Sequence, residues 1–383
     1  MSAGHAPRSR VSVLTALRHA GELTQVEIGA ATGLTAGTVS TVVAGLLDDG
    51  LVRVRDVIRT GRRARAVSLA GPGGPLIGVH CYLDEARVLL DPGDGRPAVE
   101  ALAPLPDGHR ADLAVDAARA LSGDLLAREG IDPAAVLAVA VGVPAPVEVR
   151  TGRVAGAGVR DGWVPVVAQP ALLAPAPGVP VIFDNEGNLS ALAEARLGAG
   201  RGRDTVVQVS VSQGVSGGIV HGGELVHGRT GTAGELGHLT IDPLGPICSC
   251  GNRGCLQVYA GSQAITGLLA ASHGPLTIAE VLDLATDGDP GCRRVLSDVG
   301  RHLGTAMASV CAVLDPDVLV VGGALSRAGD LLLDPLREVL AERTAVTSGA
   351  VVDVVAGQLG PAAPAHGALL LARDHALAAL LRA

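Results

Sequence analysis

The first seventy residues place apolar side chains at helical spacing, interrupted by capping residues and glycines. Residues 11–20 form the first such stretch, and its predicted apolar face consists of Val11, Leu14 and Leu17. Thr24 precedes a second stretch and Glu27 follows three positions later, the spacing of a helix N-terminal capping box. Gly33 interrupts this stretch. The pattern therefore predicts two short helices separated by a tight turn.

A third helical stretch runs from Thr35, which is also a candidate N-cap, to Gly50. Its expected buried face consists of Val39, Val42, Val43 and Leu46. Two helices joined by a short glycine-containing turn are typical of the helix-turn-helix arrangement.

After the third helix the pattern changes to alternating apolar and basic residues. The stretch LVRVRDVIRTGRRARAVSL (51–69) keeps this two-residue period on both sides of Gly61, which predicts a β-hairpin. A hairpin in this position is the wing of a winged helix-turn-helix. Near its tip it would present Arg62, Arg63 and Arg65.

The glycine- and proline-rich stretch AGPGGP (70–75) is a predicted linker. Beyond it, short β-branched stretches alternate with helical ones, which indicates an α/β fold. The predicted strands are 136–143, 179–183, 205–211 and 318–321. The predicted helices are 112–128, 189–197, 278–285, 292–314 and 329–343. We find no short internal repeat.

Composition narrows the class of protein. The chain has 383 residues, enough for two or three domains, and 48% are hydrophobic while only 1% are aromatic, so the core consists mainly of Ala, Val and Leu. The net charge of −8 argues against a protein coated with nucleic acid. An acidic protein can still carry a local basic surface. All the basic residues are arginines, which we attribute to GC-rich coding.

The N-terminal stretch MSAGHAPRSR is short and polar and leads into no apolar segment of signal-peptide type. No apolar run reaches the roughly 18–20 residues that a membrane-spanning helix needs. We therefore expect a cytoplasmic protein without a membrane partner. In that compartment disulfides are rare, and clustered cysteines more often bind a metal.

Half of the cysteines stand in one short segment, HLTIDPLGPICSCGNRGCLQ (238–257). Cys248, Cys250 and Cys255 have the spacing C-x-C-x4-C, and His238 stands ten positions upstream. Three thiolates and one imidazole suit a closed, structural, tetrahedral Zn²⁺ site, and the neighbouring glycines allow the backbone to bend. The alternative is a set of free cysteines in a glycine-rich loop. The remaining cysteines, Cys81, Cys292 and Cys311, are expected in the core.

The metal-binding segment, extended to GELGHLTIDPLGPICSCGNRGCLQ (234–257), resembles the signature of the ROK family of sugar kinases and sugar-responsive repressors. Four further segments match the family in order: GVPAPVEVRTGRVAGAGVRDGW (142–163), FDNEGNLSALAE (183–194), GVSGGIVHGGELVHGRTGTAGELGH (214–238) and DPDVLVVGGALSRAGDLLLDPLRE (315–338). The winged helix-turn-helix is similar to that of the repressor branch. The resemblance also implies that His238, Cys248, Cys250 and Cys255 are the zinc ligands.

The resemblance implies an actin/hexokinase-like fold with two α/β lobes and a cleft between them. The winged helix-turn-helix would occupy residues 1–70 and the linker 71–75. The first lobe would comprise 76–184 plus 366–383. The second lobe would comprise 185–365, with the zinc motif and the dimerisation surface.

Kinases of the family bind ATP on an Asp-x-Gly-Gly-Thr turn, and this chain departs from that pattern. His80, Cys81 and Tyr82 stand where the glycines allow close approach of the backbone to phosphate, so we expect a triphosphate to be excluded. A second glycine turn at 214–218 is partly kept. Glu186 replaces the catalytic Asp, and its longer side chain displaces the carboxylate. We therefore expect no kinase activity and assign no catalytic residue.

The resemblance assigns hydroxyl-binding groups to the cleft, and the residues in these positions are Asn185, Glu186, Glu235, His238 and Gln257. His238 would bind zinc through one ring nitrogen and sugar through the other, so the metal would orient its imidazole. Gln257 replaces the usual Glu, and Val159 stands where an Asn is common. With these two replacements, the cleft could recognise an unusual sugar, bind sugar weakly, or have lost sugar binding. For Glu186 the alternative is a solvated loop carboxylate.

DNA contacts are expected from the start of the third helix and from the wing. The predicted DNA-binding residues are Thr35, Thr38, Ser40, Thr41, Arg55, Arg62, Arg63 and Arg65. Hydroxyl groups can contact phosphates or thymine methyls but make no bidentate contact to guanine, so affinity would depend on the arginines. The alternative is a solvated arginine-rich hairpin.

These observations favour a sugar-responsive transcriptional regulator, a repressor that binds a palindromic operator as a homodimer or homotetramer, with zinc as a structural cofactor. One alternative is an ATP-dependent hexose or N-acetylhexosamine kinase. Another is a regulator whose cleft no longer binds sugar.

Overall fold

The computed structural model describes residues 5–59, 62–82, 84–106, 108–154, 162–344 and 352–380. Gly61 and Val159, which figure in the predictions above, lie outside these residues, and so does the side chain of Arg62.

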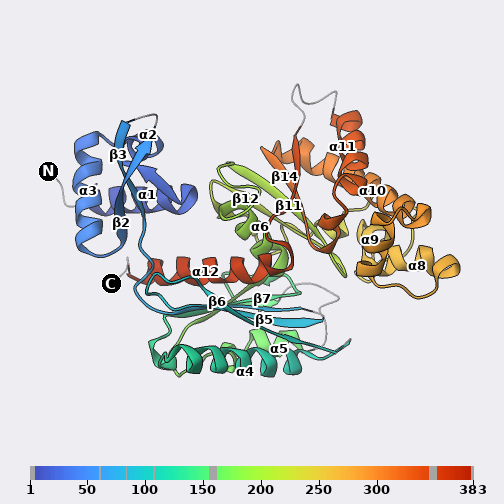
Figure 1. Cartoon of the computed structure of the whole chain (residues 1–383), viewed down its shortest axis with the longest axis horizontal. Helices are drawn as coiled ribbons and strands as arrows, with labels where there is room; N and C mark the ends of the chain where they lie inside the picture. The colour runs from blue at the N-terminus through green and yellow to red at the C-terminus, as the bar shows by residue number, and fades with distance from the viewer. Residues whose placement is uncertain are drawn as a thin grey trace.

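The N-terminal domain is the winged helix-turn-helix that the pattern predicts, seen at the left of Figure 1. Its helices are α1 (His5–Ala20), α2 (Gln25–Thr32) and α3 (Ala36–Asp48). Its strands are β1 (Glu22–Thr24), β2 (Val52–Arg59) and β3 (Arg62–Leu69). They form an antiparallel sheet in the order β1-β3-β2, in which β2 and β3 are the predicted wing.

Local hydrogen bonds explain where α2 begins and ends. The Glu27 backbone N–H donates to Thr24 Oγ1 and the Thr24 backbone N–H donates to the Glu27 carboxylate, so the predicted capping box is present. Gly33 closes the helix in the left-handed conformation. The prediction for α1 was wrong at one position: Val11 is 52% exposed, and Val13 is buried instead. Val13 is four residues before Leu17, so these two side chains share the face that the domain core covers.

The first lobe is built on a five-stranded sheet in the order β10-β7-β4-β5-β6. Its strands are β4 (Leu76–Cys81), β5 (Glu85–Asp91), β6 (Val99–Pro104), β7 (Ala138–Val143) and β10 (Val181–Asn185). Strands β4, β7 and β10 are parallel, while β4, β5 and β6 form an antiparallel meander. Every residue of β4 is buried because helices cover both faces of the sheet.

The second lobe repeats this topology with different residues. Its sheet has the order β13-β12-β11-β14-β15, in which β11, β12 and β13 are antiparallel and β11, β14 and β15 are parallel. Its strands are β11 (Thr205–Val211), β12 (Val215–His221), β13 (Glu224–Leu225), β14 (Val318–Gly322) and β15 (Asp353–Ala356). In both sheets a meander of three strands continues into two parallel strands on the side of the first strand.

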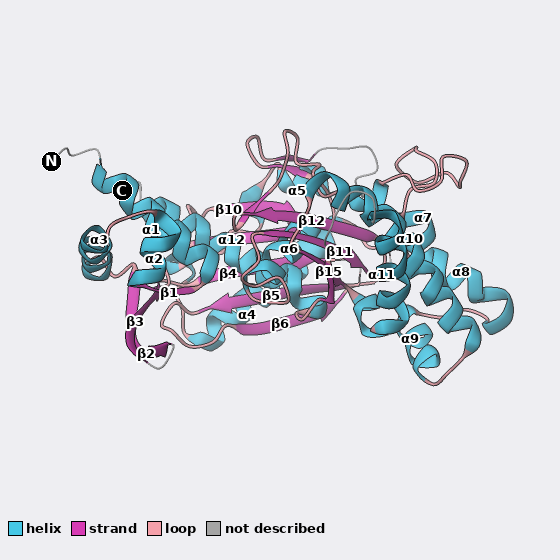
Figure 2. Ribbon diagram, turned by 90° about the horizontal axis from the view of Figure 1, so that it is seen from above, coloured by secondary structure: helices cyan, strands magenta, loops and turns pink. Residues whose placement is uncertain are grey.

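The helices form the outer layers and the layer between the sheets (Figures 1 and 2). One face of the first sheet packs against α4 (Ala111–Glu129) and α5 (Trp163–Val167), and the other against α12 (Ala363–Leu380). Helix α6 (Glu186–Arg196) packs on the second sheet and crosses α12 closely. Gly367 is required at this crossing because a Cβ atom there would collide with the Leu189 carbonyl.

An all-helical layer covers the far face of the second sheet. It consists of α7 (Gln257–Ala260), α8 (Ser262–His273), α9 (Ile278–Thr286), α10 (Pro290–Leu314) and α11 (Asp330–Thr344). The long α10 packs along α11, and both contribute to the core of this lobe. A small ribbon of β8 (Val147–Glu148) and β9 (Arg153–Val154) lies beside the first sheet.

Among the described residues, no single helix has the length and apolar composition needed to cross a membrane. Two bent helix pairs reach these criteria together, Gln25–Thr32 with Ala36–Asp48 and Gln257–His273 with Ile278–Thr286.

Helix α12 joins the body to the N-terminal domain. Near its end Leu377 is part of the apolar core of the winged helix-turn-helix. One turn earlier, Asp374 lies 2.8 Å from Arg196 of α6 and 3.7 Å from Arg18 of α1. Arg18 also pairs with Glu224 on β13. Arg18 therefore connects the winged helix-turn-helix domain to the helix on the first sheet and to the edge strand of the second sheet.

Candidate metal centre and inter-lobe cleft

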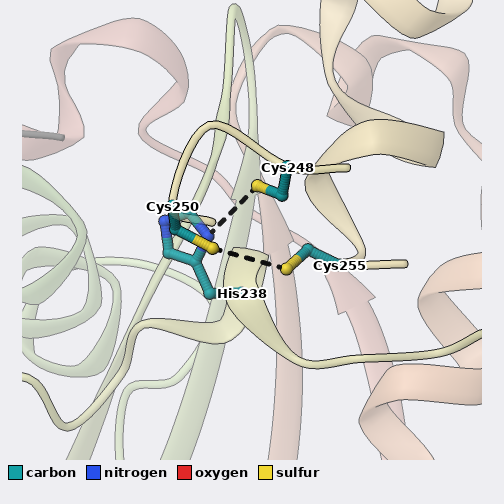
Figure 3. A group of neighbouring side chains, drawn as sticks. All are labelled: His238, Cys248, Cys250 and Cys255. Atoms are coloured by element: carbon teal, nitrogen blue, oxygen red, sulfur yellow. Dashed lines mark hydrogen bonds between the residues drawn. The ribbon is translucent and has the colours of Figure 1, made fainter. Parts of the chain in front are cut away.

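His238, Cys248, Cys250 and Cys255 converge as the sequence predicted (Figure 3). Their ligand atoms all lie within 4.8 Å of one another, with His238 Nδ1 3.6 Å from Cys248 Sγ and Cys250 Sγ 3.6 Å from Cys255 Sγ. His238 ends the 3₁₀ turn Leu236–His238, and the cysteines stand on the loop before α7. One imidazole and three sulfurs at these separations are a donor set that fits a tetrahedral metal ion.

The backbone of the cysteine loop holds the thiols in place. The Cys248 N–H donates to the Asn252 carbonyl and the Gly251 N–H donates to the Cys248 carbonyl. Gly254 has φ +60°, and a Cβ atom there would collide with the carbonyl of Asp242. The loop is therefore folded tightly by its own hydrogen bonds and by glycine.

Neighbouring thiols shift one another's pKa in opposite directions within the cluster. Burial and hydrogen bonds to Cys250 and Cys248 raise the pKa of Cys255 to about 12. Burial also opposes ionisation of Cys248, but hydrogen bonds from Cys250, Cys255 and Ser249 outweigh it and lower the pKa of that thiol. A divalent cation would allow all three thiolates to form. The other three cysteines are buried, as predicted.

The predicted hydroxyl-binding side chains adjoin the metal cluster. His238 directs Nδ1 at Cys248, and its Nε2 lies 3.9 Å from Glu235 Oε2. Burial raises the pKa of Glu235, and the negative charge of Glu186 raises it further, so the two carboxylates are close enough to repel each other. The Gln257 side chain lies beside the Gly214 turn. Glu235 thus lies beside His238 of the metal cluster and within electrostatic range of Glu186.

Asn185 has a second, local role, because its Oδ1 accepts a hydrogen bond of 2.7 Å from the Gly187 N–H and caps α6. The preceding residue, Asp184, was missed by the sequence reasoning. It is almost fully buried, and its Oδ1 accepts hydrogen bonds from the Asn185 N–H and from Asn188 Nδ2. Its Oδ2 lies 2.7 Å from Nε2 of His227, which follows β13 of the other lobe. In the sequence, Asp184 could have been found as a carboxylate near the end of an apolar, buried strand.

The Asp184–His227 pair predicts a pH dependence of stability. Burial lowers the pKa of His227, but the hydrogen bond to Asp184 and its charge outweigh this effect, so the net pKa is raised. A raised folded-state pKa stabilises the protein fully below the ordinary histidine pKa of about 6.5, and this contribution is lost as the pH rises through the raised value. We expect His227→Gln, which cannot titrate, to be less stable than the wild type on the order of 1 kcal/mol at low pH, with the gap closing at higher pH.

Urea unfolding of both proteins across this pH range measures the effect. A stability difference that stays constant with pH would contradict the assignment of the titrating group to His227.

The cleft contains contacts between the lobes at the place of the expected phosphate turn. His80 Nε2 lies 3.1 Å from Glu186 Oε2, and the His80 ring stacks on Tyr82 with centroids 5.5 Å apart. The backbone N–H of Gln213, from the turn between β11 and β12, donates to Tyr82 Oη at 3.2 Å. An amide of the second glycine turn is thus occupied by a tyrosine of the first lobe.

A cavity of about 620 Å³ lies between the lobes beside these contacts. His80, Tyr82 and Glu186 stand on its wall, together with α9 and with the residues that precede and begin α12. Of the predicted sugar-binding residues, only Glu186 lines it. The bulky side chains near residue 80 therefore border an open space and do not fill it completely.

The predicted DNA-binding hydroxyls lie at the start of α3 and are largely exposed. Thr35 Oγ1 accepts from the Thr38 N–H as the N-cap, and the Thr35 and Thr38 hydroxyls are 2.9 Å apart. Thr41 Oγ1 donates to the Gly37 carbonyl, whereas Ser40 is exposed. Val39, Val43 and Leu46 are buried as predicted, and Val42 is half-buried.

The wing arginines differ in whether their charge is already paired within the domain. Arg63 and Arg65 are exposed on β3, which leaves their charges available to a ligand. Arg55 forms a bidentate ion pair with Glu22 of β1, at 2.6 and 2.8 Å, so its charge is already neutralised within the domain. The burial of Arg62 lies outside the described structure.

Fold and site together define a two-lobe actin/hexokinase-like α/β protein with a winged helix-turn-helix domain and a His/Cys₃ cluster. The sequence model of the ROK family matches residues 123–375, and that of the MarR family matches residues 7–63. The chain belongs to the ROK family.

The relatives include both kinases and repressors. The glucokinase of Halalkalibacterium halodurans is 33% identical over 53% of this chain and 66% of its own length. The xylose repressor of Bacillus subtilis is 32% identical over 52% of each chain. This chain thus spans about half to two thirds of the length of these curated relatives.

A solved structure extends the likeness to nearly the whole chain. A ROK family transcriptional regulator, described as a homologue of the E. coli MLC protein, covers 98% of this chain and 100% of its own, with a TM-score of 0.74 and 23% identity. At this identity the likeness shows the fold, including the combination of winged helix domain and two lobes.

Proposed function

We propose that this protein is a sugar-responsive transcriptional repressor. The observation that supports it best is a winged helix-turn-helix with exposed hydroxyl and arginine side chains, connected through Arg18 and α12 to both lobes of a sugar-kinase fold. As a homodimer, or a pair of dimers, it would place one α3 in the major groove of each half of a palindromic operator. Such a regulator acts on chromosomal DNA, so we assign it to the cytoplasm.

The effector we propose is a sugar or sugar derivative held between the lobes. Asn185, Glu186, Glu235 and Gln257 supply amides and carboxylates that pair with hydroxyl groups, and His238 Nε2 lies 3.9 Å from Glu235 Oε2. We propose Zn²⁺ as the ion of the His238/Cys₃ cluster. It would hold Nδ1 of His238 and thereby fix the direction of the ring that contacts the sugar.

The test uses the purified protein and the DNA upstream of its own gene. We expect retardation of this DNA in a gel, strong weakening by salt, and release by one compound in a panel of mono- and disaccharides. The same compound should raise the melting temperature of the free protein as RT ln(1 + [L]/Kd) requires. DNA binding without any response to the panel would identify a regulator that has lost sugar sensing.

The relatives that are glucokinases favour a sugar kinase as the second candidate. Against it, His80 holds the Glu186 carboxylate that would act as base, and Tyr82 occupies a backbone donor of the glycine turn. We expect no ADP release above background with ATP, magnesium and the sugar panel. Turnover near one per second, within the usual range for kinases, would show that the protein is a sugar kinase and contradict the proposed repressor function.

The Arg18 junction predicts how the lobes and the DNA-binding domain are coupled. A ligand that favours one lobe arrangement changes operator affinity only if the domain contacts differ between the two arrangements. We expect Arg18→Met to bind the operator nearly as the wild type does, but to lose most of the sugar-induced change in affinity, which is typically 5–150-fold in coupled systems.

The matched control is Arg10→Met on the same helix, because Arg10 pairs with Asp49 inside the N-terminal domain. Titration of labelled operator with and without sugar measures both variants. Full sugar response in Arg18→Met would exclude the junction as the path of coupling.

A further inference from the structure

A second group of potential metal ligands lies in the helical layer, far along the chain from the His238 cluster. His273 is the last residue of α8, Asp289 is the N-cap of α10, and Cys292 stands in the first turn of α10. One ligand atom from each lies within 4.8 Å of the others. The segment between His273 and Asp289, residues 274–288, contains α9, which lies beside α8 and α10 in Figure 1. Its two ends meet where His273 contacts Asp289.

Both ring nitrogens of His273 have a polar partner, Nδ1 the Ser272 hydroxyl and Nε2 the Asp289 carboxylate. The Ser272 hydroxyl donates to the Leu269 carbonyl at 3.1 Å, and Ser272 Oγ lies 2.7 Å from His273 Nδ1. The serine hydroxyl has only one hydrogen, and when this hydrogen is directed at the Leu269 carbonyl, Nδ1 donates to Ser272 Oγ. In the neutral ring Nε2 then carries an electron pair, although it lies 3.2 Å from Asp289 Oδ2, which is also an acceptor. A proton or a metal cation must lie between these two atoms.

The geometry and the chemistry of the group suit a metal cation. Two ligands about 2.0 Å from one tetrahedral zinc ion are about 3.3 Å apart, close to the observed separation of His273 Nε2 and Asp289 Oδ2. The Cys292 backbone N–H and His273 lower the pKa of Asp289 to about 2, so this carboxylate is ionised. Burial raises the pKa of Cys292 to about 11, but a coordinating metal displaces the thiol proton. One carboxylate and one thiolate then balance a divalent charge.

We propose that His273, Asp289 and Cys292 form a second metal site, for a soft divalent cation of the zinc class, with water as the fourth ligand. His273 and Asp289 are about one quarter exposed, with side-chain exposures of 22% and 26%, so one side of the site is open to solvent. Ser272 holds the His273 ring from behind, as an outer hydrogen-bond partner of a metal-binding imidazole does.

The site has a structural consequence for the cleft. Residues Leu276, Thr277, Ile278, Ala279 and Leu282, all from the segment that the site closes, line the 620 Å³ cavity. A metal bound to His273, Asp289 and Cys292 would tie both ends of this segment together and so restrain one wall of the cavity.

Zinc content measured by mass spectrometry, after saturation and removal of free metal, tests the proposal. We expect two equivalents per chain in the wild type and one fewer in His273→Gln and in Asp289→Asn. Asn is also a good N-cap, so Asp289→Asn keeps α10 intact. The control is Asp287→Asn, which changes a neighbouring carboxylate outside the group and should keep full zinc content.

Cobalt(II) in a Cys250→Ser background tests the site separately from the His238 cluster. We expect one remaining equivalent with a thiolate-to-cobalt charge-transfer band, absent when His273→Gln is added. Metal should also slow hydrogen exchange in residues 274–288. Equal metal content in wild type and His273→Gln, or no cobalt band in the Cys250→Ser background, would contradict the proposed metal site. The three residues would then form only a helix cap with an ion pair. Neither readout requires DNA or sugar, so the result is independent of the proposed function.

Discussion

Replacing both Arg63 and Arg65 with alanine is expected to weaken operator binding by roughly 10²-fold near 0.1 M salt. Each phosphate contact to duplex DNA contributes about 0.9 to the slope of log K against log salt, which at this salt corresponds to a little less than tenfold per contact. Both arginines are exposed on β3, and among the described residues they have no ion pair that must first be broken.

The salt dependence is the decisive measurement for this double variant. The slope should fall by about 2, because each lost phosphate contact reduces it by about 1. Arg119→Ala removes one exposed arginine of α4, away from the winged helix, and should leave affinity and slope unchanged. If the double variant binds like this control, the wing is only a solvated hairpin.

Arg55 provides an internal comparison. Because its guanidinium is already paired with Glu22, we expect Arg55→Ala alone to change the salt slope less than either Arg63→Ala or Arg65→Ala.

Cys250→Ser is expected to lose one equivalent of zinc per chain and to lower the melting temperature by roughly 10 °C. Structural zinc contributes about 10–16 kcal/mol in small peptides, but a loop that opens locally passes only part of this to the fold, and about 3 kcal/mol corresponds to about 10 °C in a domain of 150–250 residues. A serine oxygen is a poor replacement for a thiolate, so the loop around residues 248–255 should open while the main core, which it adjoins through Leu256, stays folded.

The control is Ser249→Ala in the same loop, which removes a side chain next to the cluster but none of its four donors. Elemental analysis and thermal unfolding of both variants, before and after a strong chelator, measure the effect. Unchanged zinc content in Cys250→Ser would show that the cluster does not hold the metal. Zinc loss with unchanged melting temperature would show that the metal does not stabilise the fold.

Local sequence was sufficient wherever a short segment determines its own conformation. The Thr24–Glu27 capping box, the Gly33 stop and the Thr35 cap depend on residues a few positions apart, and all are present in the structure. The wing followed from its two-residue period, and the C-x-C-x4-C loop from cysteine and glycine spacing. The apolar face of α1 was only partly predicted, because the core of the whole domain decides that Val13 is buried and Val11 exposed.

The equivalence of the two sheets is not visible in the sequence. Both have a meander of three strands followed by two parallel strands, yet β4 reads LIGVHC and β11 reads TVVQVSV. Strand order is set by which hydrophobic faces are covered by α12, α4, α6 and α10, and many sequences satisfy that requirement.

What the sequence by itself determined is the set of elements, the family and the residues of the His238 cluster, because caps, periods and ligand spacings act over short distances. Only the tertiary structure decided the partners of the charged and polar groups: His80 with Glu186, Asp184 with His227, Arg18 with Asp374 and Glu224, and His273 with Asp289. Most of these pairs join segments tens to hundreds of positions apart. Their distances depend on how the domain and the two lobes pack, which no local pattern encodes.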